Sequence, residues 1–339
     1  MNMNILRLAF IFITYLSVMS PAIAAKPVLT IYTYDSFTSD WGPGPAVETE
    51  FEKICECDLQ FVGLDSSIGI LGRIQLEGKN TKADIALGLD TNLVHIAKET
   101  GYFAELPSTI KDIHVKNSSL PIEYDDKIFM PFDWGWFGFV FNKNILKNPP
   151  KSFQELSNMP DDIKVVIQDP RTSTPGLGLL LWIKSVYGDK STDYWRELQP
   201  KILTVTKGWS EAYALFLDGE ADMVLSYTTS PAYHLIAEEN DHYDATVFAE
   251  GNYLQIEVAG MLKSSSEPEL AAQFLEFMAS PEFQNIIPTT NWMYPAYNAE
   301  IPEGFEALAK PSKTLLFDSK SVATNQKNWI DEWLTASTK

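Results

Sequence analysis

Short apolar runs alternate with amphipathic stretches along most of the chain. The apolar runs have the length and composition of buried strands, and each amphipathic stretch repeats its apolar positions at helical spacing. The predicted strands lie at residues 28–33, 59–62, 83–87, 163–167, 202–206 and 222–225. The predicted helices lie at residues 46–54, 68–77, 91–100, 177–187 and 210–217. Alternation of this kind predicts mainly parallel sheets with helices on both faces, which is an α/β fold.

Two longer β-like segments interrupt the alternation and divide the chain into two lobes. They lie near residues 134–141 and 255–262, and we expect them to cross between the lobes as a two-strand hinge. Lobe 1 is predicted to span residues 25–135 and about 258–339, and lobe 2 to span residues 136–257, hinge strands included. About 300 residues suffice for two lobes that each bury a core.

The first 24 residues have the pattern of a signal peptide. Arg7 supplies a positive charge, residues 8–19 are apolar, and Ala22-Ile23-Ala24 is a small-residue cleavage pattern. The apolar run is too short to span a bilayer comfortably. We expect a chain that is exported, cleaved and soluble in the periplasm.

Charge narrows the range of partners. The chain has 26 basic and 45 acidic residues, and removal of Arg7 with the signal peptide leaves a net charge of −20. Phosphate backbones would be repelled, so nucleic acid is excluded as a partner, while a small cation would be attracted. Alternatively, the acidic excess does no more than keep the protein soluble. Cys55 and Cys57 are able to pair only in a small ring, and the sequence leaves their oxidation state open.

The run from Gln168 to Gly178 places polar groups at the end of a strand and the start of a helix. Thr174 suits the N-cap of that helix, and Pro175 suits its first position. Hydroxyls and free backbone N–H groups there favour an anion or a polar ligand.

Aromatic and hydroxyl side chains recur at the same kind of position elsewhere in the chain. Because ligands of open α/β sheets bind beyond the carboxyl ends of strands, these residues predict one cleft. They are Tyr34, Trp41, Ser66, Ser67, Ser173, Thr174, Trp209, Tyr227, Thr228, Thr229, Ser230, Tyr233 and Trp292. Aromatic walls with hydroxyl-rich ends suit a flat, partly cationic heteroaromatic molecule.

Several long strings in the sequence resemble one known family. They include VLTIYTYDSFTSDWGPG at residues 28–44, QDPRTSTPGLGLLLW at residues 168–182, VLSYTTSPAY at residues 224–233 and PTTNWMYP at residues 288–295. The chain resembles the periplasmic thiamine-binding proteins of bacterial ABC importers, in order and over nearly its whole predicted mature length. The resemblance implies a type II-like periplasmic binding protein with two α/β lobes, and a binder rather than an enzyme.

The resemblance also implies the cargo and the partner. Thiamine, thiamine monophosphate or thiamine pyrophosphate would be captured and passed to an inner-membrane ABC permease, with no cofactor and no metal. The cleft residues named above would contact the ligand. At Ser66 and Ser67 the family pattern leads us to expect an acidic residue followed by glycine. Two serines there suggest a preference for a phosphorylated form, because a repulsive carboxylate is gone.

Other functions remain open from the residues themselves. A ferric-ion or polyamine binder would share the scaffold, although Trp209 and Trp292 argue for an organic ligand and the cleft candidates are richer in hydroxyls than in acids. A secreted hydrolase using Ser173 or Asp65 lacks the usual nucleophile and phosphate-loop motifs. A last helix near residues 328–334 carries Trp329 and Trp333 on one face, which we interpret as packing anchors.

Overall fold

The computed structural model describes residues 25–110, 113 and 118–337, so the predicted signal peptide lies outside the described residues. The strands are β1 (Val28–Tyr34), β2 (Asp58–Leu64), β3 (Ile85–Asp90), β4 (Met130–Asn142), β5 (Val165–Gln168), β6 (Ile202–Thr206), β7 (Met223–Tyr227), β8 (Tyr243–Ala245), β9 (Asn252–Met261), β10 (Tyr294–Pro295) and β11 (Thr314–Leu315).

The helices fall between the strands, much as the sequence pattern predicts. They are α1 (Asp35–Thr38), α2 (Gly44–Cys55), α3 (Ser67–Glu77), α4 (Val94–Glu99), α6 (Phe153–Ser157), α7 (Thr174–Tyr187), α8 (Ser191–Leu198), α9 (Trp209–Leu217), α10 (Pro231–Ala237), α11 (Pro268–Met278), α12 (Pro281–Gln284), α13 (Ile287–Thr290) and α14 (Ser319–Ser337). Within the described ranges, no helix combines the length and apolarity needed to cross a membrane.

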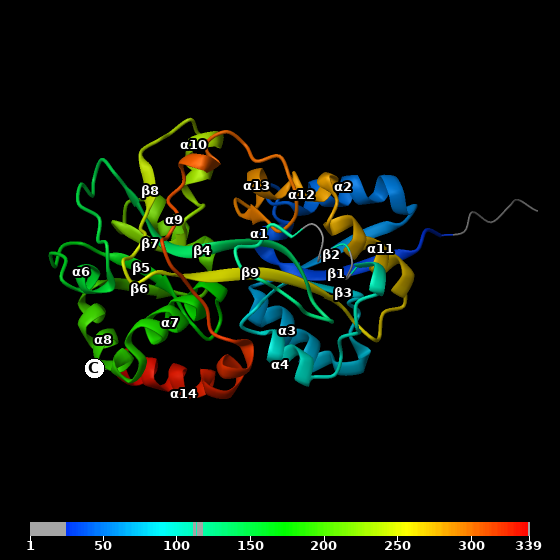
Figure 1. Ribbon diagram of the computed structural model, residues 1–339, viewed down its shortest axis with the longest axis horizontal. Helices are drawn as coiled ribbons and strands as arrows, with labels where there is room; N and C mark the ends of the chain where they lie inside the picture. Colours follow the sequence, from blue (N-terminus) through cyan, green and yellow to red (C-terminus); the bar gives the residue numbers. More distant parts are fainter. Residues whose placement is uncertain (1–24, 111–112, 114–117, 338–339) are drawn as a thin grey trace, which may run out of the picture.

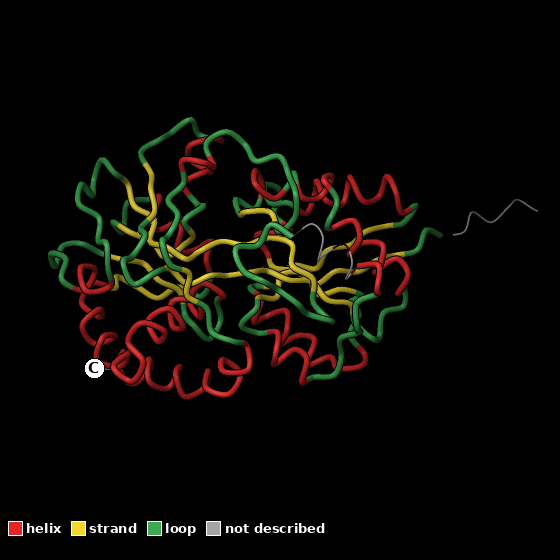
Figure 2. Tube along the Cα trace, viewed as in Figure 1, coloured by secondary structure: helices red, strands yellow, loops and turns green. Residues whose placement is uncertain are grey.

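The strands form a sheet in the order β2-β1-β3-β9-β4-β7-β5-β6. The pairs at its two ends are parallel, whereas β9 pairs antiparallel with β3 and β4, and β4 pairs antiparallel with β7. The long strands β4 and β9 therefore run through the middle of the molecule and join its two halves (Figures 1 and 2). This is the two-lobed α/β fold expected from the sequence. The exact lobe boundaries stay a prediction.

Helices cover the sheet because their apolar faces are buried against it. In lobe 1, α3 packs on β1 and β3, while α2 and α11 pack together near β9 and β2. In lobe 2, α7 packs on β7 and β9, and α9 packs on β5 and β7. The interior of α7 contains Trp182, which is fully buried and donates from its indole nitrogen to the carbonyl of Gly251 at 2.8 Å. Each lobe thus has a rigid frame around its cleft-facing loops.

Two predicted caps are wrong. Ser173, not Thr174, is the N-cap of α7, and the Thr174 hydroxyl instead donates to Ser67 at 2.9 Å. The spacing of Ser266 and Glu269 in the sequence also predicts a capping box. It does not form, because α11 starts at Pro268, one residue later than the box requires, and Glu267 is its N-cap. In both places a proline lies at the start of the helix, and at α7 the Thr174 hydroxyl bonds to Ser67 instead of capping.

The final helix is longer than predicted and touches both lobes. α14 packs against α7 and α8 of lobe 2 and against α4 of lobe 1, along the lower edge of Figure 1. Trp333 is buried beside Trp195, and Trp329 packs against Phe317. Both tryptophans lie outside the cavity lining described below, which agrees with their interpretation as anchors.

Cys55 and Cys57 form a disulfide at the end of α2. The residue between them, Glu56, has a left-handed backbone (φ 51°) and is the C-cap of the helix. The short ring therefore coincides with the turn that ends α2.

Candidate functional site

A cavity of about 880 Å³ lies between the lobes, within the range of about 300–1,000 Å³ typical of ligand pockets. Every predicted cleft residue except Thr228 and Thr229 lines it. These two threonines are fully buried behind the wall, where the Thr229 hydroxyl faces the sulfur of Met293 at 3.7 Å. The fold thus brings loops from distant parts of the sequence to one place.

One wall of the cavity is an aromatic platform at the start of α9. The indole of Trp209 stacks on Tyr213, with ring centroids 4.9 Å apart. Its Nε1 donates to Ser226 Oγ at 2.8 Å, and the Tyr213 hydroxyl lies 2.9 Å from His234 Nε2. Both rings are therefore held in place from behind, and the half-buried Trp209 is ready to stack on a flat ligand.

Further rings come from lobe 1 and from α10. Trp292 and Tyr233 meet edge to face at 5.4 Å. Trp292 has φ 54°, a left-handed conformation that is rare outside glycine and that is often retained at binding sites. Trp41 is 55% exposed at the rim, which is unusual for so large an apolar side chain unless a ligand or lobe closure covers it.

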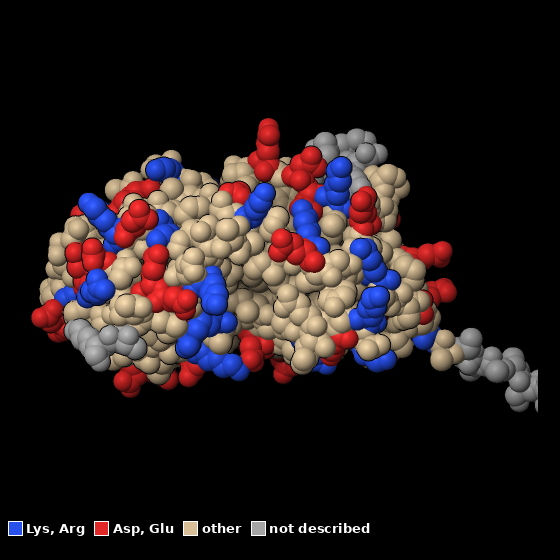
Figure 3. Space-filling model, turned by 90° about the horizontal axis from the view of Figure 1, so that it is seen from below, with Lys and Arg blue, Asp and Glu red and all other residues tan. Residues whose placement is uncertain are grey.

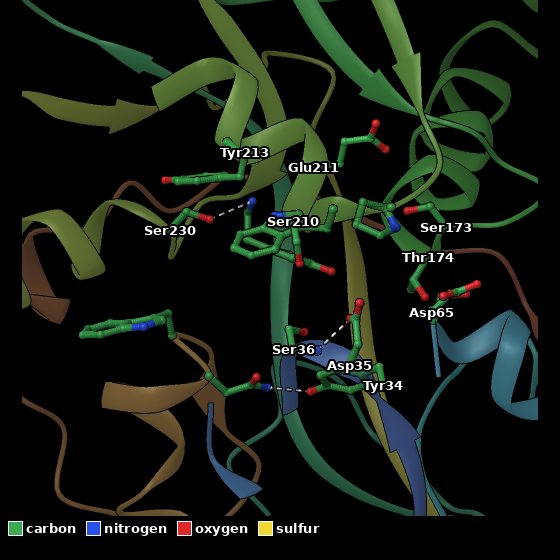
Figure 4. Close-up of a pocket in the computed structure, with 18 of the residues that line it drawn as sticks. Tyr34, Asp35, Ser36, Asp65, Ser173, Thr174, Ser210, Glu211, Tyr213 and Ser230 are labelled. Atoms are coloured by element: carbon green, nitrogen blue, oxygen red, sulfur yellow. Dashed lines mark hydrogen bonds between the residues drawn. The ribbon is translucent and has the colours of Figure 1, made fainter. Parts of the chain in front are cut away.

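The opposite end of the cavity is rich in hydroxyls. The amino ends of α3 and α7 meet there, from different lobes, with Ser66 Oγ donating to the carbonyl of Thr172 at 2.7 Å. Ser67 accepts from Thr174 and donates to the carbonyl of Gly88 at 2.5 Å. Figure 4 shows Ser173 and Thr174 beside Asp65 at this end. Converging helix N-termini and hydroxyls suit an anionic group.

A salt bridge crosses the mouth at the same end. Lys207 Nζ lies 2.5 Å from Asp65 Oδ2, and both side chains are well exposed. Their charges offset each other, so the nearby carboxylate does not by itself make this end repel an anion. Solvent screening makes the bridge worth little to stability.

The floor of the cavity holds a residue that the sequence analysis missed. Glu257 lies on β9 and is only 6% exposed, yet it lines the cavity. Tyr34 donates to its Oε2 at 2.7 Å, and Asn291 donates to the Tyr34 hydroxyl at 2.9 Å. Burial raises the pKa of Glu257 well above its usual value, and the neighbouring Asp133 carboxyl raises it further. A glutamate inside the apolar run QIEVAG was the available signal, because buried carboxylates are rare without a role.

The other unpredicted lining residues lack so clear a signal. They are Asp35, Ser36, Asp65, Pro175, Lys207, Gly208, Ser210, Glu211, Tyr213, Ala214, Leu217, Ala237, Asn291 and Met293. From the sequence, Asp65 is named only as a candidate hydrolase residue, and the others lie in helices and loops that only the fold brings to the cavity.

Outside the cavity, charged side chains of both signs are spread over the surface. Figure 3 shows acidic and basic side chains intermixed over both halves of one face. On that face the acidic excess is not gathered into one block, which suits a general role in solubility.

Two α/β lobes that enclose an aromatic cleft across two connecting strands define a solute-binding protein. The chain belongs to the family of bacterial extracellular solute-binding proteins, whose family model matches residues 43–285. Family membership makes it a binding component of transport rather than an enzyme.

Comparison with individual proteins supports membership of this family. The chain is 54% identical to the thiamine-binding periplasmic protein of Escherichia coli strain K12 over 92% of this chain and 94% of that protein. It is 44% identical to the Haemophilus influenzae protein of the same name over 99% of this chain and 100% of that one. A solved structure of a periplasmic thiamin binding protein is 53% identical, with a TM-score of 0.88, over 93% of this chain and 97% of that one.

Proposed function

We propose that this protein is the substrate-binding component of an ABC importer and captures thiamine and its phosphate esters in the interlobe cleft. It acts in the periplasm after cleavage of the signal peptide and delivers its cargo to an inner-membrane permease. The proposed ligand contacts are the eleven sequence-predicted residues that line the cavity, without the buried Thr228 and Thr229. The observation that carries the proposal is the Trp209 platform facing a cavity whose far end holds two helix N-termini.

The ligand matches the cavity in both shape and charge. Thiamine has a flat aminopyrimidine ring and a permanently cationic thiazolium ring. A stacked ring contributes about 1–3 kcal/mol, and a cation over an aromatic face about 0.5–2 kcal/mol. The relatives that carry thiamine in their names are 54% and 44% identical to this chain over nearly its whole length, which supports the same cargo here.

The hydroxyl-rich end supports phosphate esters as cargo. Ser66 is the N-cap of α3 and accepts from the backbone N–H of Gly69 at 3.3 Å. The partial positive charge of a helix N-terminus favours a phosphate, and no carboxylate stands at Ser66 or Ser67 to oppose it. The ester tail would therefore lie between α3 and α7.

The proposal is tested by titrating the refolded, ligand-stripped mature protein with thiamine, its monophosphate and its pyrophosphate in a calorimeter. Stripping is needed because a tight binder often purifies with its ligand. Sub-micromolar binding of at least one form is expected. Absence of heat and of any thermal shift with all three would refute the proposal and leave ferric ion or a polyamine as the next cargo to test.

A substitution at the N-cap tests the phosphate end. Ser66→Asp is expected to weaken binding of thiamine monophosphate about threefold to tenfold more than binding of thiamine, because a carboxylate then competes for the helix terminus and repels the phosphate. Ser66→Ala is the control, since it removes the bond to the Thr172 carbonyl without adding charge. Equal losses for both ligands in Ser66→Asp would place the phosphate elsewhere.

A further inference from the structure

Three carboxyl groups lie in a row across the strands at the floor of the cavity. Asp133 on β4 is directly opposite Glu257 on β9, and Glu257 is directly opposite Asp90 on β3. Directly opposed residues of antiparallel strands point to the same face with their Cβ atoms about 5 Å apart. All three side chains are at least nine-tenths buried, and Glu257 is the member that faces the cavity.

Among the residues that the structure describes, none supplies a cationic partner to the row. The titratable groups that face Glu257 are Tyr34 from β1, Asp133 from β4, Asp90 from β3 and Tyr227 from β7, and each is an acid. No ion pair among the described residues includes any member of the row. Like charges opposed across a sheet destabilise it, and a buried carboxylate without a partner is costly.

Hydrogen bonding satisfies the row only in part. Glu257 accepts from Tyr34 at 2.7 Å and from Gln255 Nε2 at 2.9 Å, and Asn291 donates to Asp133 Oδ2 at 2.5 Å. Asp133 Oδ1 and Asp90 Oδ2 are buried without a hydrogen-bond partner among the described residues. The floor therefore holds three carboxyl groups for which the described residues supply no opposite charge.

We infer that Glu257, with Asp133 and Asp90 behind it, is the counter-charge for the cationic ring of the ligand, and that binding releases a proton from this row. The inference rests on the proposed function and adds a specificity-determining residue to it. In the empty cleft the row keeps at least one proton, since burial raises the pKa of Asp133 to about 7 and that of Glu257 well above its usual value. A cation above Glu257 favours the ionised form, so the proton leaves to solvent as the ligand enters.

Proton release on binding fixes the direction in which ligand affinity changes with pH. Affinity for a permanent cation rises with pH, because less of the row must be deprotonated on binding. We expect the folding stability of the empty protein to change with pH in the opposite direction. A carboxyl whose folded pKa exceeds its unfolded value destabilises the fold once it ionises, so stability falls as pH rises from about 4 through 7 and above. Bound thiamine should reverse that loss.

Calorimetric titration with thiamine from about pH 6 to about pH 8, in buffers of low and high ionisation enthalpy, tests the inference. The unchanged protein should gain about tenfold in affinity and release roughly half a proton to one proton. Glu257→Gln keeps the shape of the side chain but should bind about tenfold more weakly at the upper pH, without proton release beyond that of the ligand's own aminopyrimidine. Glu220→Gln, at an exposed carboxyl outside the cavity, is the matched control and should behave as the unchanged protein.

A second variant guards against misfolding of the first. Asp133→Asn removes like-charge repulsion, so the rise in affinity should move to lower pH. Thiamine binding that is equally tight at every pH, with no buffer-dependent heat, would overturn the counter-charge while leaving the proposed function intact. Absence of thiamine binding at every pH would overturn both.

Discussion

Replacement of Trp209 by alanine is expected to weaken thiamine binding by at least about tenfold while the protein stays folded. The indole forms the exposed face of the platform on Tyr213, and loss of one stacked ring costs about 1–3 kcal/mol. The helix should persist, because alanine is the best helix former and Trp209 is the first residue of α9. Calorimetric titration with thiamine, alongside a thermal melt without ligand, measures both effects.

Two further variants separate stacking from hydrogen bonding at this position. Trp209→Phe keeps a ring but loses the bond to Ser226, and Ser226→Ala removes the same bond from the other side. Each should cost less than Trp209→Ala, since the ring remains. A binding curve for Trp209→Ala that superimposes on that of the unchanged protein would exclude Trp209 from the pocket.

Replacement of Gly178 by alanine is expected to cost at least about 2 kcal/mol of unfolding free energy. A Cβ atom at this position would lie 2.0 Å from the ring of Phe137, which real Cβ atoms do not tolerate. Phe137 is fully buried on β4 and stacks on Tyr227, so it has little room to move and any shift reaches the cavity wall. Urea unfolding of the ligand-free protein gives the change, and a titration with thiamine should show weaker binding as well.

Gly72 supplies a matched control on a different helix. It lies inside α3, is exposed, and a Cβ atom there would meet nothing within 4 Å. Gly72→Ala should therefore raise the unfolding free energy by about 0.5–1 kcal/mol through helix propensity. If Gly178→Ala left the urea midpoint unchanged or raised it as Gly72→Ala does, the close packing of α7 on β4 would be contradicted.

The sequence predicted most of the architecture because hydrophobic periodicity is strong in an α/β protein. The strand–helix order, the two connecting strands and eleven of the thirteen cleft residues agree with the structure. Their gathering at strand ends is a general property of parallel sheets, so no contact needed to be known in advance. The ligand contacts of these residues still await measurement.

The sequence does not reveal the lateral register of the strands, which decides which residues lie opposite one another. Asp90, Asp133 and Glu257 are far apart in the chain, and only the pairing of β3, β9 and β4 brings them into one row. A bulge lies next to the row in both strand pairs, and pattern reasoning does not locate bulges. Thr228 and Thr229 follow β7 but are fully buried and do not line the cavity, which their place in the sequence does not reveal.

The position of α14 has a mechanical consequence. Because this helix contacts α4 in one lobe and α7 and α8 in the other, the lobes are tied at their periphery as well as through β4 and β9. If only β4 and β9 bent, α4 and α14 would be pushed together or pulled apart. Movement of one lobe relative to the other therefore requires α4 and α14 to slide along each other. Packed side chains resist such sliding, so we expect α14 to limit how far the cleft of the empty protein opens.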